Sequence, residues 1–488
     1  MGWQPGGEPP PPPPVPPESP RPAPWDAPPP PEPSGRGPGE QGRPALAAGL
    51  AIALAVSLAI NVILALRVKD ETDQQAALRA RVEELRDEVD TLRRKDPGSG
   101  RSILQQIASA VEKIRELKFK TTVKSQVVTD EKLADEVEKR FVQDSPRKEI
   151  DESDAVLTTL GLLGKNDDLY SISLGVVREQ VAGFYDFKKK LLVAGGDAVN
   201  PTPLDEVLLA HEYVHALTDQ YYDLNRLDAL HDARKDDEAT ALACLVEGDA
   251  TVMMFNYASQ YLTPSERVQV QQEAAAAPSQ RLESAPKALR EALLFPYEEG
   301  ASWVRSLIAN GGVAALNKAY QDPPTSTEQI LHIAKYLNRD EPTPVEMPNL
   351  ARSMGSGWTP ITGGGVGELD VRLIVDQFLP RSEAERAAAG WDGGRYAAAD
   401  SNKGTIVAAL TVWDSETEAR EATSTFGRWL PARFGNKGND ARFANAVGRG
   451  WESADGAGAV FRDGARVLLV IGPDRASVER ARGAFAGF

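Results

Sequence analysis

The sequence predicts an α+β protein: a mostly helical domain with one small edge sheet, then a second α+β domain, both behind a single transmembrane helix. Three observations lead to this prediction. Apolar residues recur at helical spacing through most of residues 101–350, where two short apolar runs also have the pattern of strands. Strand and helix patterns alternate through residues 365–488. One uncharged stretch, residues 45–66, is long enough to cross a bilayer.

Composition limits the kinds of site that the chain can hold. The formal net charge is −16, so the chain lacks the positive footprint that phosphate backbones require, and we expect no nucleic-acid partner. Cys244 is the one cysteine, which excludes an intramolecular disulfide and a cysteine-rich zinc cluster. Any bound metal must therefore be held by histidines and carboxylates.

Residues 1–44 form a proline-rich tail that holds 19 of the 36 prolines of the chain. We expect this tail to be disordered and partly polyproline II. Composition favours a solvated spacer over a segment that docks in an aromatic groove of a partner, and it names no partner.

Residues 45–66 carry no charge over 22 positions, and we interpret them as one transmembrane helix. A signal peptide has a shorter apolar stretch, and a helix apolar on all sides fits lipid better than a protein core. Basic residues are more frequent after the span than before it, which favours a cytoplasmic C-terminal side. Long domains translocate largely regardless of charge, however, and a charged tail without a signal is a poor candidate for export. We therefore expect a single-pass cell-membrane protein whose tail is internal and whose following domain is extracytoplasmic.

Residues 67–96 have the pattern of a short helical stalk. Apolar residues recur there at spacings of 4, 3, 4 and 3, at Leu78, Val82, Leu85, Val89 and Leu92. This is the seam of a coiled coil, which predicts a stalk that can pair two copies into a homodimer. An amphipathic helix that packs on its own domain explains so short a seam equally well. Asp96-Pro97-Gly98-Ser99-Gly100 ends the stalk.

Two short strands precede the segment that carries chemistry. Within Gln180–Ala194, the runs VAGFYD and KLLVA are joined by a basic turn, Lys188-Lys189-Lys190. We expect Leu191–Ala194 to be an edge strand beside the site, where its backbone can align a peptide substrate.

A helix is predicted from Pro203 to about Gln220. Thr202 can cap it, Pro203 suits its first position, and Asp205 places negative charge in its first turn. His211 and His215 are four residues apart in this helix, so their side chains lie on one face and can converge on one metal ion.

Glu212 directly follows the first of these histidines. Its position about 100° round the helix lets its carboxylate approach a metal-bound water without becoming a ligand. Zinc lowers the pKa of such a water, and Glu212 can take its proton and pass it to a leaving amine. The alternative is that His211 and His215 only form hydrogen bonds in a core.

A catalytic zinc site with two histidines needs a third protein ligand, and the next helix, about residues 236–260, supplies carboxylates. Glu247 is flanked by apolar residues, so it is the acid that most needs a buried partner. Glu238 is the alternative ligand, but it faces the opposite side of the same helix. Only one of the two can bind the ion.

These residues resemble the gluzincin group of zincin metallopeptidases, in which the two histidines of HExxH and a Glu from a following helix bind zinc. The resemblance rests on His211, Glu212, His215 and the run Glu247-Gly248-Asp249-Ala250-Thr251. Several gluzincins have an Asp where this chain has Thr251, and that Asp supports a zinc-bound His. The runs GFYD, HEYVHALTDQYYDL, EGDAT and PTSTEQILH are also similar to predicted bacterial membrane-anchored metallopeptidases, a likeness over roughly residues 180–335 that implies no substrate.

Supporting roles are open at this stage. Asp219 or Asp249 can orient an imidazole. Three side chains are candidates for stabilising the oxyanion of the transition state: His332, Tyr297 and His231.

The remaining chain is predicted to be further helices, such as 286–294 and 326–337, and then a glycine-rich linker at 355–367. Residues 365–488 show one helix, five strands and two more helices, with helix starts at Asp414-Ser415 and Pro473-Asp474. No catalytic constellation occurs in this second domain, so we expect it to serve packing or substrate recruitment.

The sequence therefore predicts a membrane-anchored zinc peptidase that acts on a peptide or protein substrate: His211, His215 and Glu247 bind Zn²⁺, and Glu212 activates water. One alternative is a non-enzymatic membrane scaffold with an inert HExxH helix. Another keeps the metal but performs a different hydrolytic reaction.

Overall fold

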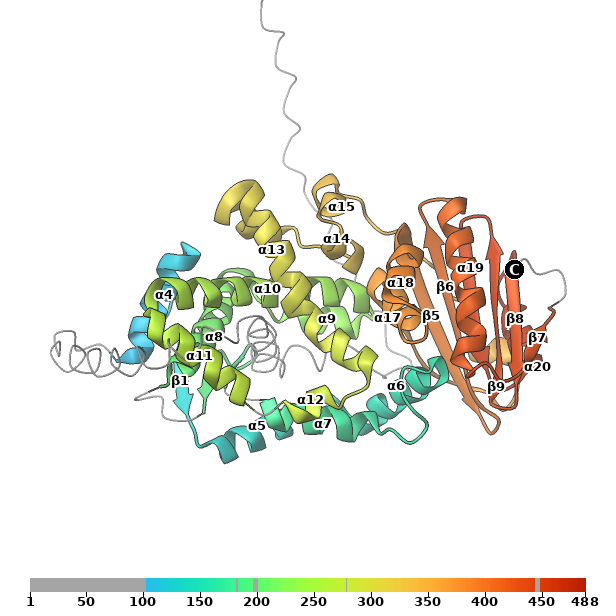
Figure 1. The fold of residues 1–488 in the computed structure, drawn as a ribbon, viewed down its shortest axis with the longest axis horizontal. Coiled ribbons are helices and arrows are strands. Elements are labelled where there is room, and N and C mark those ends of the chain that lie inside the picture. Colours follow the sequence, from blue (N-terminus) through green and yellow to red (C-terminus); the bar gives the residue numbers. More distant parts are fainter. Residues whose placement is uncertain (1–101, 181–182, 196–200, 278, 444–447) are drawn as a thin grey trace, which may run out of the picture. The chain divides into compact units, whose positions relative to one another are not determined.

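The computed structural model describes residues 102–180, 183–195, 201–277, 279–443 and 448–488 (Figure 1). The predicted tail (1–44), transmembrane helix (45–66) and stalk (67–96) lie outside these residues. Among the described helices, none combines the length and the apolar character needed to cross a membrane.

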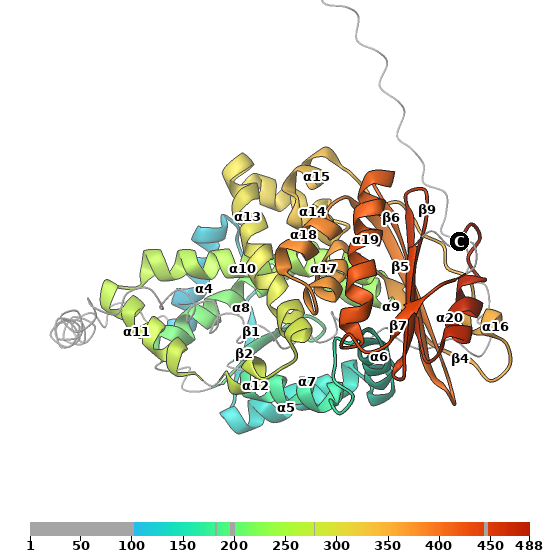
Figure 2. The same ribbon diagram turned by 45° about the vertical axis from the view of Figure 1, so that its right-hand side comes forward.

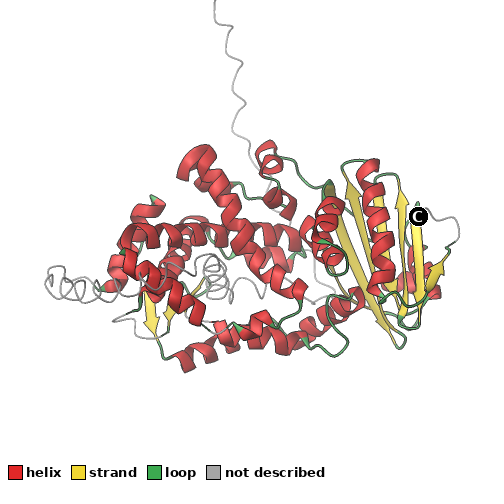
Figure 3. Ribbon diagram, viewed as in Figure 1, coloured by secondary structure: helices red, strands yellow, loops and turns green. Residues whose placement is uncertain are grey.

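Helices and sheets are both present, which confirms the α+β class (Figure 3). The first part of the described chain is helical. Its helices are α4 (Ile103–Arg115), α5 (Asp130–Asp144), α6 (Arg147–Leu160), α7 (Leu169–Gln180), α8 (Pro203–Tyr222), α9 (Arg226–Asp232), α10 (Asp236–Tyr261), α11 (Pro264–Ala276), α12 (Gln280–Glu283), α13 (Lys287–Gln321), α14 (Thr327–Leu331), α15 (Ile333–Asn338) and α16 (Leu350–Met354).

The start of α8 follows from local chemistry. The Thr202 side chain accepts a hydrogen bond from the Asp205 amide, the Asp205 carboxylate accepts one from the Thr202 amide, and Pro203 occupies the first turn. Such reciprocal bonds satisfy amides that have no partner inside the helix. The predicted start of this helix is therefore confirmed, and its end lies at Tyr222, two residues beyond the predicted one.

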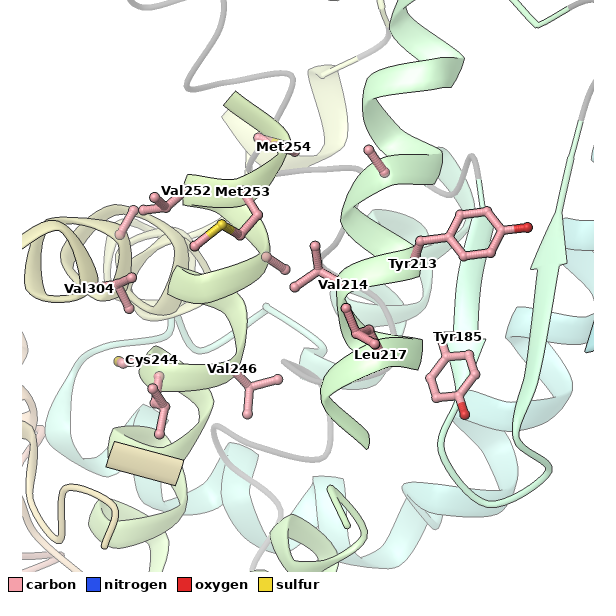
Figure 4. Packing of buried hydrophobic residues seen from close by; sticks show 14 of the residues in the cluster. Tyr185, Tyr213, Val214, Leu217, Cys244, Val246, Val252, Met253, Met254 and Val304 are labelled. Carbon is pink, nitrogen blue, oxygen red and sulfur yellow. The ribbon is translucent and has the colours of Figure 1, made fainter. Parts of the chain in front are cut away.

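The core of the helical part lies between α8, α10 and α13. Figure 4 shows Val214 of α8 directed towards α10, where Val246 and Met253 lie, while Tyr213 extends from the opposite side of α8 towards the strands. Val304 of α13 completes the same buried cluster. Burial of each large aliphatic side chain contributes about 1.5–3 kcal/mol, so this cluster holds the two site-bearing helices together.

Glycines allow α10 and α13 to touch backbone to backbone. A Cβ atom at Gly248 would collide with the carbonyl group of Gly300, and one at Gly300 would collide with the carbonyl oxygen of Cys244. The crossing point of the two helices therefore lies directly beside Glu247.

Two predicted helices differ from their expected extent. The helix predicted at 286–294 continues through α13 to Gln321, with non-helical dihedrals at Gly311 and Gly312. The helix predicted at 326–337 is divided into α14 and α15 at His332, whose φ of −128° and ψ of 84° are not helical.

The small sheet has the order β1-β3-β2. Its strands are β1 (Lys124–Val127), β2 (Gly183–Asp186) and β3 (Leu191–Ala194). β3 pairs in parallel with β1 and antiparallel with β2, so β3 is the central strand. The prediction that Leu191–Ala194 is an edge strand is wrong, because β1 pairs with its other side. The four residues of β1 are all exposed and show no apolar alternation that would predict a strand. The edge strand that contacts α8 through its backbone is β2.

The C-terminal part is one antiparallel sheet with the order β4-β5-β6-β10-β9-β8-β7. Its elements are β4 (Thr359–Gly365), α17 (Glu368–Asp376), α18 (Arg381–Ala388), β5 (Trp391–Ser401), β6 (Gly404–Trp413), α19 (Glu416–Arg433), β7 (Asn439–Ala441), β8 (Gly448–Ser453), β9 (Gly456–Asp463), β10 (Arg466–Gly472) and α20 (Arg475–Arg482).

Helices cover both faces of this sheet, as Figure 2 shows. Ile406 and Ala408 of β6 share a hydrophobic cluster with α16 and α20, whereas Val407 between them shares one with α19. This alternation is the period of two that strands impose. The α19 side also includes α6, and Arg433 donates to the carbonyl groups of Thr158 and Thr159.

The prediction of a linker at 355–367 is wrong, because this stretch contains β4, which pairs with β5. Its glycines permit close packing. A Cβ at Gly364 would collide with the Asp236 carboxylate, and one at Gly367 would collide with that of Asp237. The N-terminus of α10 therefore contacts the end of β4.

Candidate metal centre

The three predicted ligands meet at one point. His211 Nε2 lies 3.2 Å from Glu247 Oε2, His215 Nε2 lies 3.3 Å from the same oxygen, and the two Nε2 atoms are 3.0 Å apart. The three side chains are at most 2% exposed. Among the described residues, they form the group of His, Cys and acidic side chains that could hold a metal ion.

The size of this triangle fits an ion with tetrahedral coordination. Zinc bonds to nitrogen and oxygen of roughly 2.0–2.1 Å place neighbouring ligand atoms about 3.3 Å apart. Without a metal, hydrogen bonds can satisfy the triangle if His215 Nε2 carries a proton that faces Glu247 Oε2 and the unprotonated His211 Nε2. A divalent cation bound to the three atoms satisfies the same triangle in place of that proton.

The protonation states of His211 and Glu247 suit a metal, whereas His215 would have to release a proton to bind one. Burial lowers the pKa of His211 to about 4, so its imidazole is neutral at neutral pH. Burial alone would raise the pKa of Glu247, but the adjacent His215 and His211 outweigh it and lower that pKa to about 2. Burial likewise disfavours protonation of His215, yet Glu247 outweighs it and raises the His215 pKa. An anionic carboxylate beside two imidazoles is the donor set that zinc accepts.

Glu212 lies against the edge strand beside this triangle. Its Oε2 accepts a hydrogen bond of 2.7 Å from the Tyr185 amide of β2, whereas its buried Oε1 has no hydrogen-bond partner among the described residues. Burial raises the pKa of Glu212 to about 8. The Glu247 charge adds to this increase, and the His215 charge opposes it. One oxygen is thus anchored. At this pKa the carboxyl is protonated at neutral pH, so it would act as a base only when a cation held by the three neighbouring side chains lowers its pKa.

Aromatic side chains contact both histidines. The Tyr297 ring of α13 stacks on His211 with centroids 6.3 Å apart and planes at 24°, and Phe187 meets His215 edge-on at 5.9 Å. Burial and the charges of Glu247 and Glu212 raise the pKa of Tyr297 well above its ordinary value, so its hydroxyl keeps its proton. This contact of Phe187 is not among the predictions from the sequence; the signal for it is the place of Phe187 directly after GFYD.

The other two oxyanion candidates lie elsewhere. His332 Nε2 is 3.1 Å from the Glu368 carboxylate of α17. His231 lies in α9, where burial lowers its pKa to about 4. Neither belongs to the group of side chains that could hold a metal ion. Of the three candidates, Tyr297 is the one that contacts a candidate ligand, His211.

The alternative ligand and the two candidate supporting acids have other partners. Glu238 pairs with Lys235 at 2.8 Å. Asp219 accepts from Tyr185 Oη at 2.9 Å and from Lys190, and Asp249 accepts from Arg115. The Nδ1 atoms of His211 and His215 have no hydrogen-bond partner among the described residues, so neither acid orients an imidazole by a direct bond.

Comparison with known proteins concerns the C-terminal part. The model of one family, described as "Domain of unknown function (DUF8575)", matches residues 361–482. These residues run from within β4 to the end of α20 and include no residue of the candidate metal centre. No curated protein and no solved structure matches the chain.

Proposed function

We propose that this chain is a zinc-dependent peptidase, anchored to a membrane through residues 45–66 with its catalytic part outside the cytoplasm. The observation that carries the proposal is the arrangement of four buried side chains: three ligand atoms within 3.0–3.3 Å of one another, with Glu212 beside them. The resemblance of the HExxH helix and of Glu247 to gluzincins supports the same assignment.

In this proposal, His211, His215 and Glu247 would hold the zinc ion. A bound zinc ion supplies Lewis acidity, which lets water lose a proton near neutral pH. The Tyr185 amide holds Glu212 Oε2, so that Oε1 takes the proton of the attacking water and delivers it to the leaving amine. The protonated Tyr297 hydroxyl is the donor we assign to the developing oxyanion.

Burial of the site supports a second candidate. Structural zinc sites are closed, and all three ligand side chains here are at most 2% exposed. The chain could thus be a non-enzymatic membrane scaffold in which the HExxH helix only stabilises the fold. A hydrolase that acts on esters is the third candidate, and it differs from the first in substrate alone.

The test uses the full-length chain purified in detergent. We expect about one zinc per chain by elemental analysis, and loss of zinc in His211→Ala. Hydrolysis of a mixed peptide library should fall at least about a hundredfold in Glu212→Gln while the zinc content is unchanged. Glu238→Gln, a carboxylate of α10 outside the site, is the matched control and should resemble the wild type.

The outcomes separate the candidates. Zinc binding without hydrolysis of peptides or esters would favour the scaffold, and hydrolysis of esters alone would favour the third candidate. A wild-type chain that binds no zinc would refute the metal centre itself.

A further inference from the structure

A second buried charged group lies close to Glu247. Arg115 ends α4 and Asp249 lies in α10; their side chains are both 0% exposed, and Arg115 Nε is 2.9 Å from Asp249 Oδ2. The Tyr320 hydroxyl of α13 donates to the same oxygen at 2.9 Å, and Arg115 also donates to Asn317 Oδ1 at 2.7 Å. This ion pair therefore links α4, α10 and α13 inside the protein.

Three consecutive residues of α10 have three different partners. Glu247 faces the histidines, Gly248 makes the backbone contact with Gly300, and Asp249 pairs with Arg115. The link extends to α8, since Tyr222 at the end of that helix stacks on Tyr320 with centroids 4.5 Å apart. The turn of α10 that carries Glu247 is thus held on several sides.

The geometry of a helix makes this hold important for metal binding. The Glu247 carboxylate lies several ångströms from the axis of α10, so a rotation of the helix by about 10° moves it by roughly 1 Å. Metal–ligand distances tolerate only about 0.2 Å. A metal centre built from two helices therefore needs a device that sets their relative rotation.

Stability alone does not explain the ion pair. Both charges lose their hydration in the interior, and replacement of a buried ion pair by uncharged side chains is often neutral or stabilising. Directional bonds from Arg115 and Tyr320 to one carboxylate oxygen do specify one rotational setting of α10.

We propose that Arg115 and Asp249 are positioning residues of the metal centre: their buried ion pair sets the rotation of α10 and so holds Glu247 at bonding distance from an ion shared with His211 and His215. This inference rests on the proposed metal site. It concerns the affinity and geometry of that site, which metal binding reports without any activity measurement.

The experiment is a Co²⁺ titration of the full-length chain, followed by visible absorption, because the cobalt band reports both affinity and coordination geometry. The main variant is the double substitution Arg115→Met with Asp249→Asn, which removes both charges and leaves neither one unpaired. We expect it to fold with a melting temperature near that of the wild type, to bind Co²⁺ at least about tenfold more weakly, and to show an altered band. The matched control is Lys287→Met with Asp376→Asn, which removes a 2.8 Å ion pair between α13 and α17 and should leave the titration unchanged.

A folded double variant with wild-type affinity and spectrum would overturn the proposal, because the ion pair would then serve the fold alone. If the double variant does not fold, Tyr320→Phe decides, since it keeps both charges and removes one hydrogen bond to Asp249. We expect Co²⁺ affinity to fall roughly threefold in that variant, and unchanged affinity would again overturn the proposal. A wild-type chain that binds no Co²⁺ would refute the metal centre instead.

Discussion

The α8–α10 pair and the C-terminal sheet are both well packed, but they bury different kinds of side chain. The two helices bury His211, Glu212, His215, Glu247 and Asp249. The described strands β5 to β10 bury no charged side chain. Burial of a charge costs free energy unless the charge is paired, so the helical region maintains an arrangement that packing alone does not require. The difference is consistent with the proposed function, in which the chemistry lies in the helices.

The largest effect should come from the third ligand. Replacement of Glu247 by Ala should lower zinc affinity strongly. The loss should exceed the roughly ten- to hundredfold decrease that follows removal of a residue hydrogen-bonded to a metal ligand. Glu238→Ala, on the opposite side of α10, should have wild-type affinity. Competition with a chelator measures the zinc affinity of both variants. Unchanged affinity in Glu247→Ala would mean that another group completes the site.

The sheet should respond in stability and not in metal binding. Leu468 of β10 is 0% exposed in the central strand, so Leu468→Ala should cost about 2–5 kcal/mol in the free energy of unfolding. Below the unfolding transition, its zinc affinity should equal that of the wild type. Denaturant titration and chelator competition test the two statements. A parallel loss of affinity would show that the two regions are not independent.

Two glycines allow a matched comparison. In Gly248→Ala, the new methyl group meets the backbone of α13 at Gly300, and we expect a loss of about 1–3 kcal/mol together with weaker zinc binding. In Gly427→Ala of α19, the nearest atom would be Arg449 Cβ at 3.5 Å, an ordinary contact. Since Ala is the better helix former, that variant should be as stable as the wild type or up to about 1 kcal/mol more stable. Equal effects at both positions would contradict the backbone contact.

The smallest effect concerns Asp237, where α10 meets the end of β4. Burial, with the charges of Asp370 and Glu368, raises its pKa from 3.8 to about 8. An acid with a raised pKa in the folded state contributes stability that is complete below the unfolded pKa and is lost as the pH rises through the folded one. We therefore expect Asp237→Asn to raise the melting temperature relative to the wild type at pH 8.5 and less so at pH 5. An equal difference at both pH values would argue against a raised pKa.

Local signals account for the parts of the site that were predicted. Thr202, Pro203 and Asp205 specify the start of α8, and the spacing of His211 and His215 follows from helix periodicity. The lysine turn correctly separates β2 from β3. Each of these signals lies within a few residues of the feature that it predicts.

Distant partners account for what was missed. The exposed strand β1 and the glycine-rich strand β4 lack an apolar alternation, and only their pairing with β3 and β5 makes them strands. Two contacts also join segments that are far apart in the chain: the ring contact of Phe187 with His215 and the ion pair of Arg115 with Asp249.

By itself, the sequence determined the α+β class and the extent of α8 and α10. It also determined that His211, Glu212 and His215 lie close together on α8. These features follow from periodicity and capping, which act over neighbouring residues. It also limited the third candidate ligand to a carboxylate. Only the tertiary structure brought together Glu247 and the histidines, made β2 the edge strand in place of β3, and placed Tyr297 on His211. The physical reason is that helix rotation, strand order and the Gly248–Gly300 contact depend on packing between distant segments, which no local pattern encodes.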